Sequence, residues 1–518
     1  MIRWQPHLVV LPIVLPLAAA ALMLFVSEQR RMVKRMVSSL TMLAVLAVAA
    51  LLVQQAGQGP PAVYRLGGWP APFGIVLVAD RLAALMVLLA SLLALAALVF
   101  SFARWDRAGP RFHSLVLVLL MGVNGAFLTG DLFNLFVFFE VFLAASYGLA
   151  LHGAGAARVQ AGLHYIVVNL AAALLFLVGV ALIYGVTGTL NLADLALRIP
   201  ATAGTGRTLL EAGAAVLGIA FLVKAGMWPL CFWLPRAYGM ACAPAAAVFV
   251  ILTKVGIYAI LRVWLLFFGG TEAAPHFGQE VLIAGGLLTL AVGAIGVFSS
   301  PSLSRLATCS LIVSCGTLLA ALGTGDPAVS AASLYYLVAS TLGLGTLFLL
   351  IEPMERSGGE AGVRSITEES VGSFEAEDRE EVGVAIPAAW AFLGMSFVVC
   401  ALLVAGLPPM PGFVAKLALL DALIRPEPVG ASAWMLMSLL LLSGLSTLVA
   451  ASRIGARIFW MPAQPLAARV SAIEMMAVLL LLGAAILLVV QAGPVMQYLG
   501  DTAQALHAPH DYLEGVLD

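Results

Sequence analysis

The chain has 518 residues, of which 62% are hydrophobic and only 10% are charged. A soluble protein carries about 25% charged residues, and a water-facing fold of this length has too little interior for so many apolar side chains. The net charge of −1 excludes a polybasic nucleic-acid-binding protein. The composition therefore predicts a polytopic membrane protein.

Lysine is scarce and unevenly placed. Of the 26 basic residues, 22 are Arg and four are Lys. Lys34 lies among arginines in a predicted cytoplasmic loop, whereas the others lie inside apolar stretches: Lys224, Lys254 and Lys416. A GC-rich coding bias explains why loops carry Arg, but not why these three lysines remain. Because a buried Lys can release its proton and Arg cannot, the pattern indicates proton chemistry within the membrane.

Long apolar runs predict about fourteen transmembrane helices. A helix needs about 20 apolar residues to cross the hydrocarbon core, and continuous rather than alternating runs indicate helices, not strands. In chain order the predicted spans are 7–26, 33–54, 80–103, 113–129, 131–151, 160–186, 209–235, 240–267, 280–299, 302–323, 330–352, 386–424, 432–455 and 471–493. The predicted fold class is therefore an all-α polytopic membrane protein.

The distribution of Lys and Arg over the loops predicts the orientation. With the N-terminus outside, 16 basic residues fall on the cytoplasmic side, seven outside and three within the membrane. Both termini are therefore expected outside. The first span has its positive cluster after the apolar run, the reverse of a signal peptide, so we expect it to be retained. The acid-rich segment 353–384 is predicted to be a solvated cytoplasmic loop, with a partner surface as the alternative.

Prolines interrupt two predicted spans. The seventh contains KAGMWPLCFWLPRAY, beginning at Lys224, and the twelfth contains GLPPMPGFVAK, ending at Lys416. Broken helices at matching places in two halves are typical of inverted-repeat transporters with an ion site at the breaks. The breaks lie five spans apart, which predicts two inverted five-helix repeats in spans 4–8 and 9–13; isolated proline kinks are the alternative.

This division predicts four segments along the chain. They are the first three helices in 1–112, the first repeat in 113–270, the second repeat with its loop 353–384 in 280–460, and the last helix with the C-terminal tail in 461–518.

Ionisable residues inside the spans are the main candidates for function, because charge within a membrane is costly and usually faces a cavity or a partner. Glu140 lies mid-span in FNLFVFFEVFLAASYG, and Lys254 lies mid-span in AAAVFVILTKVGIYAILR. Glu140 is predicted to pair with a lysine of a neighbouring helix. When such a pair opens, the freed lysine repels a proton from Lys254, which couples local electrostatics to proton transfer. Purely structural ion pairs are the alternative.

Several other polar residues are weaker candidates. His164 is a proton relay or a hydrogen-bonded core histidine, Arg305 reaches inward from the start of the tenth span, and Asp421 is an exit group or an interfacial residue. Asp80 and Arg262 lie near span ends and are expected at the membrane interface.

No sequence motif for a cofactor is present. There is no P-loop, no GxGxxG after a strand, no haem motif, no iron–sulfur cysteine run, and no CxxC pair among the five cysteines. We therefore expect no cofactor and no ATP hydrolysis, and transport driven by ion gradients or by a partner subunit.

Five segments together resemble the antiporter-like subunits shared by respiratory complex I, membrane-bound hydrogenases and Mrp-type (Pha-type) multisubunit cation/proton antiporters. They are GDLFNLFVFFEVFLAASYG at 130–148, YGVTGTLNLADLA at 184–196, KAGMWPLCFWLPRAY at 224–238, LTKVGIYAILR at 252–262 and GLPPMPGFVAK at 406–416. The phrases FFEVFLAASYG and GTLNLADLA, with Cys231 and Tyr238, are most similar to the D-subunit family of Mrp antiporters.

The resemblance implies a polar axis at the membrane midplane. It implies that Glu140 pairs with Lys224, that Lys254 is the central proton carrier and that Lys416 is the terminal one. It also implies a bacterial inner-membrane complex with A, B, C, E, F and G subunits, which exchanges external protons for cytoplasmic Na⁺ or K⁺ across the lipid bilayer. A proton-pumping subunit of complex I or of a hydrogenase is the alternative, and a structural scaffold is a third.

The chain departs from many relatives in the eleventh span, where Ala339 and Leu344 stand in place of a His and a Lys. Proton passage between Lys254 and Lys416 then needs water and hydroxyl groups. The candidate hydroxyls in this span are those of Tyr335, Ser340 and Thr341.

Overall fold

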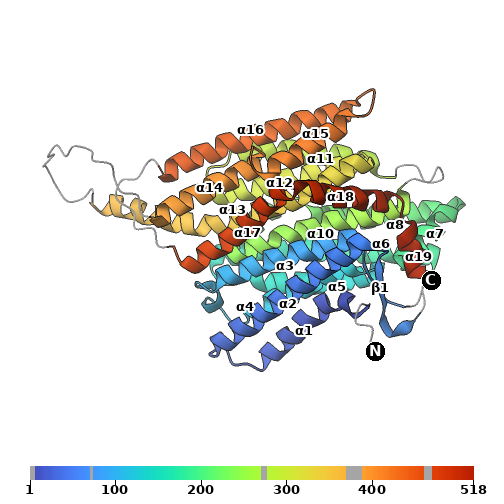
Figure 1. Ribbon diagram of the computed structural model, residues 1–518, viewed down its shortest axis with the longest axis horizontal. Helices are drawn as coiled ribbons and strands as arrows, with labels where there is room; N and C mark the ends of the chain where they lie inside the picture. The colour runs from blue at the N-terminus through green and yellow to red at the C-terminus, as the bar shows by residue number, and fades with distance from the viewer. Residues whose placement is uncertain (1–5, 70–73, 270–276, 369–387, 460–469, 518) are drawn as a thin grey trace.

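The structure is a computed structural model that describes residues 6–69, 74–269, 277–368, 388–459 and 470–517. Twelve of the described helices are long and apolar enough to cross a membrane, and two shorter apolar helices accompany them. Figure 1 shows them as one bundle of roughly parallel and antiparallel rods. The predicted all-α polytopic fold class is confirmed.

The fourteen apolar helices match the fourteen predicted spans. They are α1 (Leu11–Leu24), α2 (Arg31–Gln58), α3 (Arg81–Ser101), α4 (Phe112–Leu128), α5 (Leu132–Ala150), α6 (Ala156–Thr187), α8 (Gly204–Ala225), α10 (Ala243–Phe268), α11 (Gln279–Phe298), α12 (Leu303–Leu322), α13 (Pro327–Glu368), α14 (Ala388–Ala405), α16 (Ala431–Phe459) and α17 (Ala472–Val490). The first part of the segment 353–384, which was predicted to be a loop, is helical in the structure, since α13 continues through Glu368. Residues 369–387 lie outside the described residues.

The two proline-interrupted spans are each split into two helices. The seventh consists of α8 and the short α9 (Leu234–Met240), and the twelfth consists of α14 and α15 (Pro411–Ile424). Gly226 and Gly406 follow the first helix of each pair with φ of 73° and 79°, the left-handed conformation that glycine adopts without strain. In both, the next residue's N–H returns to a carbonyl five positions earlier, from Met227 to Leu222 and from Leu407 to Leu402. The two breaks therefore share one backbone geometry.

Helix packing also recurs between the two halves. In the first half, α4 packs on α5, α6 on α8, and α8 on α10. In the second half, α11 packs on α12, α13 on α14, and α14 on α16. Because each half contains five spans, corresponding helices cross the bundle in opposite directions.

The elements that do not span gather mainly at one end of the bundle. They include η1 (Pro6–Val9), the antiparallel strands β1 (Ala62–Arg65) and β2 (Val76–Ala79), η2 (Leu66–Gly68), α7 (Leu192–Ala201), α18 (Ala492–His507) and α19 (His510–Leu517). Strand β1 contacts both η1 and α19, so the first and last described elements lie together, at the right in Figure 1. We call this the terminal end.

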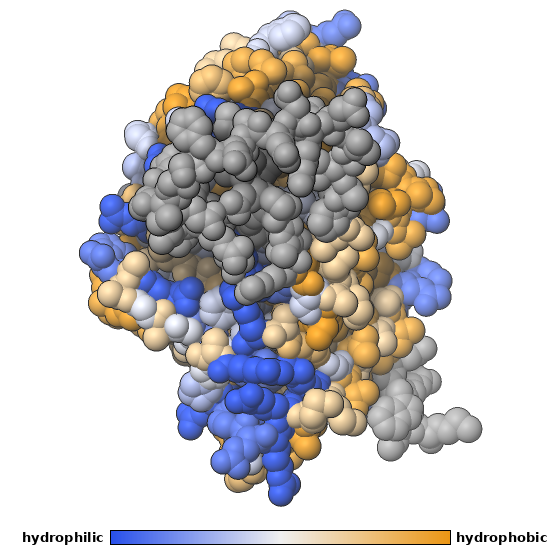
Figure 2. Space-filling model, turned by 90° about the vertical axis from the view of Figure 1, so that its left-hand side faces the viewer, coloured by the Kyte–Doolittle hydropathy of each residue, from blue (hydrophilic) through white to orange (hydrophobic). Residues whose placement is uncertain are grey.

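The opposite end carries η3 (Trp105–Arg107) and exposed basic side chains. Figure 2 looks onto this end and shows hydrophilic residues gathered low in the view, over the elements drawn at the bottom of Figure 1. The exposed arginines of the connections in this region are Arg30, Arg31, Arg104, Arg107 and Arg111.

Helix α10 is the innermost element. All 18 residues of its most apolar stretch are buried, whereas fewer than half are buried in the corresponding stretches of α6 and α16. In Figure 1 it runs through the middle of the bundle. Outer helices instead expose large apolar residues, such as Leu170 and Leu174 of α6 and Leu441 and Leu445 of α16, which suits lipid or a hydrophobic partner.

Candidate functional site: a buried polar axis

The three predicted intramembrane lysines are all buried. Lys224 lies in the last turn of α8, Lys254 lies in the middle of α10 and Lys416 lies in the second turn of α15, with 6%, 0% and 7% of their surfaces exposed. Two of them therefore stand beside the helix breaks, where backbone groups are freed from helical hydrogen bonding. The third stands on the most enclosed helix of the bundle.

Lys224 is held by a residue of α6. Its Nζ donates to the side-chain Oδ1 of Asn169 at 2.9 Å and approaches the main-chain oxygen of the same residue at 3.5 Å. The Asn169 Nδ2 group donates to the carbonyl of Tyr165, which fixes the amide so that its oxygen faces the lysine. Asn169 is 1% exposed.

Sequence reasoning missed Asn169. The available signal was a lone amide in the apolar run HYIVVNLAAALLF, but such a residue also suits a helix-packing hydrogen bond. Which lysine it faces depends on how α6 and α8 pack, and the sequence does not specify this.

Glu140 lies on α5 near Lys224 but makes no direct ion pair with it. Among the described residues, no nitrogen–oxygen contact within 4.0 Å joins the two groups, although their charges interact. The Oε1 atom of Glu140 is buried and has no hydrogen-bond partner in the described part of the chain. The Tyr147 hydroxyl on α5 is also buried without a hydrogen-bond partner among the described residues. It interacts electrostatically with Glu140. The structure thus shows an arrangement in which the predicted pair is not closed.

Lys254 begins a hydrogen-bonded chain that runs through hydroxyl groups of two other helices. Its Nζ donates to Oγ of Ser314 on α12 at 2.6 Å, and that hydroxyl donates to Oγ of Ser340 on α13 at 3.0 Å. The Ser340 hydroxyl in turn donates to the carbonyl of Leu337 at 3.2 Å. No carboxylate of the described residues lies within 4.0 Å of the lysine. A buried ammonium without a counter-charge is costly, so this position suits a group that changes its protonation state.

A small cavity continues from these serines to Lys416. It lies between α12, α13, α14, α15 and α16 and provides about 20 Å³ for water centres, enough for about one molecule. Its polar lining consists of Ser310, Ser314, Tyr336, Ser340, Lys416, Ser443 and Thr447. The Ser310 hydroxyl is buried there without a hydrogen-bond partner among the described residues. The cavity is therefore lined both by Ser314, which accepts from Lys254, and by Lys416.

The helix break places an acceptor beside Lys416. Its Nζ donates to the carbonyl of Ala405 at 2.8 Å, the last residue of α14. Glycines make room for the ammonium, because a Cβ at Gly444 would lie 2.9 Å from Nζ and a Cβ at Gly406 would lie 2.6 Å from Cδ.

Of the three hydroxyls predicted for the eleventh span, the structure brings one to the cavity. Ser340 lines it, whereas Tyr335 donates to the carbonyl of Leu488 on α17 and Thr341 donates to the carbonyl of Leu337 in its own helix. Tyr336, the neighbour of Tyr335, lines the cavity in its place. Adjacent residues of a helix point about 100° apart, and the uniformly apolar sequence of this span does not indicate which of the two tyrosines faces the cavity.

The structure does not bring His164, Arg305 or Asp421 to the axis. His164 and Arg305 are exposed on the bundle surface, and Nδ1 of His164 lies within hydrogen-bonding distance of the carbonyl of Gln160 in its own helix. Asp421 accepts a 2.5 Å hydrogen bond from Arg425 one turn later, and more than half of each side chain is exposed.

One expectation about a polar residue near a span end is wrong, and one ion pair near span ends was not predicted. Asp80 and Arg262, expected at the membrane interface, lie at the terminal end of the bundle and form a bidentate ion pair with distances of 2.5 and 2.7 Å, at 15% and 8% side-chain exposure. Lys34 does not lie in a loop but in the first turn of α2, where it is buried and donates to Glu28 at 2.7 Å. In both cases the partner lies on a neighbouring segment.

Within the described residues, no group of three or more His, Cys, Asp or Glu side chains is placed to hold a metal ion. The five cysteines are buried and unpaired.

The chain is similar to known antiporter proteins over its whole length. The family model described as "NADH:quinone oxidoreductase/Mrp antiporter, TM" matches residues 129–447, which contain Glu140 and all three intramembrane lysines. A protein of Rhizobium meliloti, named as the D subunit of a probable K(+)/H(+) antiporter, is 54% identical, covering 100% of this chain and 98% of its own. The D subunit of the Na(+)/H(+) antiporter of Alkalihalophilus pseudofirmus is 34% identical, with 99% of each chain covered.

The fold agrees with these relatives. A chain in the structure of the Mrp complex from Dietzia sp. DQ12-45-1b superposes with a TM-score of 0.85 at 26% identity, and all of both chains is covered. The matched family, the full-length relatives and the shared fold all lead to one assignment. The chain belongs to the NADH:quinone oxidoreductase/Mrp antiporter transmembrane family and, within it, to the antiporter D subunits.

Proposed function

We propose that this chain carries protons in a multisubunit antiporter that exports cytoplasmic Na⁺ or K⁺ in exchange for external protons. One observation carries the proposal: the buried Lys254 is joined through Ser314, Ser340 and a water-sized cavity to the buried Lys416. A lysine without a counter-charge, bonded to hydroxyls that both donate and accept, can release and regain a proton.

Glu140 and Lys224 act in this proposal as a switch on the first half of the axis. The structure has Lys224 on Asn169 and leaves a Glu140 oxygen without a partner among the described residues, which corresponds to the open arrangement. An open pair exposes Lys254 to the positive charge of Lys224 and favours proton release. Closing the pair screens that charge and favours proton uptake, so Asn169 competes with Glu140 for the same ammonium.

We infer that the protein lies in a bacterial cytoplasmic membrane with its terminal end outside. The exposed arginines at the opposite end then face the cytoplasm, as the positive-inside rule requires. The partner set of A, B, C, E, F and G subunits follows from membership of the D subunits, and apolar helices such as α6 and α16 offer surfaces for them and for lipid.

A proton-pumping role in a redox complex would use the same axis, so geometry alone does not separate the two functions. The full-length relatives at 54% and 34% identity are both named as antiporter subunits, and this favours exchange.

Antiport in everted vesicles from an antiporter-deficient strain tests the proposal. The complete complex is expected to exchange protons for Na⁺ or K⁺, and Glu140→Ala or Lys224→Ala is expected to abolish exchange while the complex still assembles. Absence of exchange with both cations by the wild-type complex, combined with copurification of redox subunits, would favour the pump instead.

A further inference from the structure

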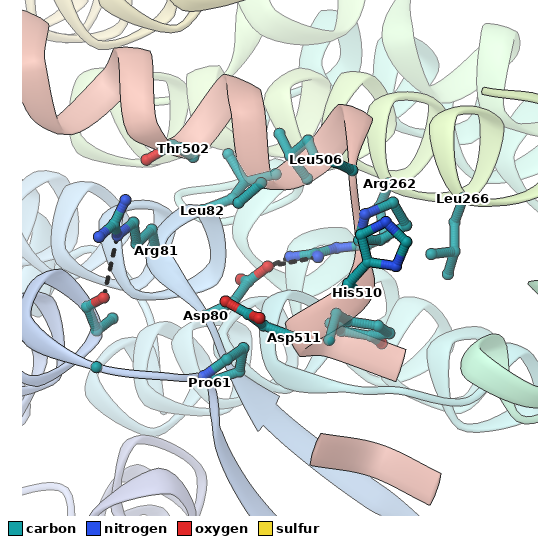
Figure 3. Close-up of a pocket in the computed structure, with 16 residues that line it drawn as sticks. Pro61, Asp80, Arg81, Leu82, Arg262, Leu266, Thr502, Leu506, His510 and Asp511 are labelled. Carbon is teal, nitrogen blue, oxygen red and sulfur yellow. Dashed lines mark hydrogen bonds and ion pairs between the residues drawn. The ribbon is translucent and has the colours of Figure 1, made fainter. Parts of the chain in front are cut away.

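A cavity of about 220 Å³ opens at the terminal end, away from the axis of lysines. It is enclosed by the end of α2, the start of α3, the end of α10, and the C-terminal helices α18 and α19. Figure 3 shows Arg262 reaching from α10 to Asp80 in this cavity, with His510 and Asp511 beside them. The volume accommodates several water molecules.

Arg262 closes the inner side of this cavity. Its guanidinium forms the bidentate pair with Asp80 and lies near the rings of Tyr258 and Tyr512, 5.5 and 5.3 Å from their centroids. Asp80 is fixed in turn, because it caps α3 by accepting from the N–H of Ala83 at 2.9 Å. The ion pair and the two rings thus form a plug between the cavity and the interior of the bundle.

The plug lies on the same helix face as the central lysine. Lys254, Tyr258 and Arg262 are spaced four residues apart on α10, so their side chains follow one another along one face. A 3.3 Å hydrogen bond joins Arg262 to the Tyr258 hydroxyl, which donates to the carbonyl of Phe127 at 2.6 Å. Because α10 is enclosed on all sides, a proton that leaves Lys254 toward the terminal end needs a route along this face.

We propose that this cavity is the outer water-filled port of the proton route and that the Asp80–Arg262 pair is its gate. In the structure the gate is closed. A proton arriving at the Asp80 carboxylate from the cavity cancels the charge that holds Arg262, which frees the guanidinium and opens the way to Tyr258. Arg262 keeps its own charge and repels Na⁺ and K⁺, whereas the proton enters bound covalently to the Asp80 carboxylate and so without its charge.

The inference rests on the proposed function and its orientation, and the chain offers a matched pair of positions to test it. Ala505 and Gln504 are consecutive exposed residues of α18, but only Ala505 lines the cavity. Ala505→Cys and Gln504→Cys place a thiol inside and outside the port, and Ala508→Cys is a second cavity position. The native cysteines of this chain are buried, so they should contribute little background labelling.

Intact cells carrying the whole complex are treated with a membrane-impermeant sulfonated thiosulfonate reagent, and antiport is measured in everted vesicles made from them. We expect all three cysteines to react, antiport to fall at least fivefold after modification at 505 and 508, and antiport to stay unchanged after modification at 504.

Unchanged antiport after modification at 505 and 508 would overturn the port. So would reaction at 504 without reaction at either cavity position, or reaction of all three only from the cytoplasmic side. A wild-type complex without any antiport would instead refute the proposed function, so the two failures are distinguishable.

Discussion

The Nζ atom of Lys254 donates a 2.6 Å hydrogen bond to the hydroxyl of Ser314. This contact joins α10 to α12 at the centre of the bundle, and the Ser314 hydroxyl continues to Ser340 on α13. In the proposed route, the step from the central to the terminal lysine depends on hydroxyls and water, because α13 carries no His or Lys.

Replacing Ser340 by Val should slow antiport about tenfold, because it removes a hydroxyl from the route and fills part of a cavity that holds about one water. Thr346→Val is the matched control. Thr346 lies on the same helix, is buried, and donates to the carbonyl of Leu342 as Ser340 donates to that of Leu337. Equal antiport rates of the two variants in everted vesicles would show that the Ser340 hydroxyl is not part of the proton route.

Replacing Asn169 by Leu should lower antiport about tenfold, because a hydrogen bond to a charged group contributes about 1.5–3 kcal/mol and Lys224 loses its present partner. Without Asn169 as a competing acceptor, the Lys224 ammonium stays paired with Glu140, so the switch stays closed. The rate is measured against pH in everted vesicles, and its pH profile should shift. Asn124→Leu removes a buried amide that bonds Pro12, outside the axis, and should leave the profile in place.

Gly444→Ala should impair transport by displacing the Lys416 ammonium, because the added Cβ would lie 2.9 Å from Nζ and 2.8 Å from the carbonyl oxygen that it binds. Gly483 on α17 has nothing within 4 Å of its position for a Cβ. Gly483→Ala should therefore keep full antiport, and the gain in helix propensity should raise the melting temperature slightly. Normal exchange by Gly444→Ala would show that Lys416 needs no such clearance.

Asp106 should stabilise the end of the bundle opposite the terminal end in a pH-dependent way. Burial acts to raise the pKa of this carboxyl, but hydrogen bonds and charge from His113 and Arg35 outweigh burial and hold the pKa below its ordinary value. Its contribution is therefore complete above the ordinary pKa and is lost as pH falls through the lowered one. Asp106→Asn should reduce the free energy of unfolding at pH 7 by about 3 kcal/mol, because it removes the buried carboxylate that neutralises Arg35.

Thermal unfolding of the detergent-solubilised complex measures this effect. The difference between wild type and Asp106→Asn should shrink as the pH falls through the lowered pKa. Asp421→Asn breaks an exposed pair with Arg425 and should change the free energy of unfolding by less than about 1 kcal/mol. Equal effects of the two substitutions at pH 7 would show that the buried carboxylate adds no more stability than the exposed one.

The spans, their number and the two helix breaks could be predicted from the sequence, because long apolar runs and prolines act locally. The burial of Lys224, Lys254 and Lys416 followed from the same runs. Partners across helices could not be predicted in this way. Ser314 and Asn169 are ordinary polar residues until the packing of α12 against α10 and of α6 against α8 brings them to the lysines.

The same reason explains why the Asp80–Arg262 pair was not predicted and why the expectation for Lys34 was wrong. Asp80 and Arg262 each lie near the end of a span, and the ends of α3 and α10 meet and turn the two charges toward each other. Lys34 looks like a loop residue because it follows a run of arginines, yet α2 begins at Arg31. Cross-helix contacts of this kind require the three-dimensional arrangement.

The most direct test of proton transfer at Lys254 is its substitution by Arg, which keeps the positive charge but not the ability to release a proton. Lys34→Arg is the control, because Lys34 forms an ion pair with Glu28 away from the axis and Arg can form the same pair. Antiport is measured in everted vesicles at matched amounts of assembled complex. We expect Lys254→Arg to abolish exchange and Lys34→Arg to be silent; normal exchange by Lys254→Arg would show that Lys254 does not carry the proton.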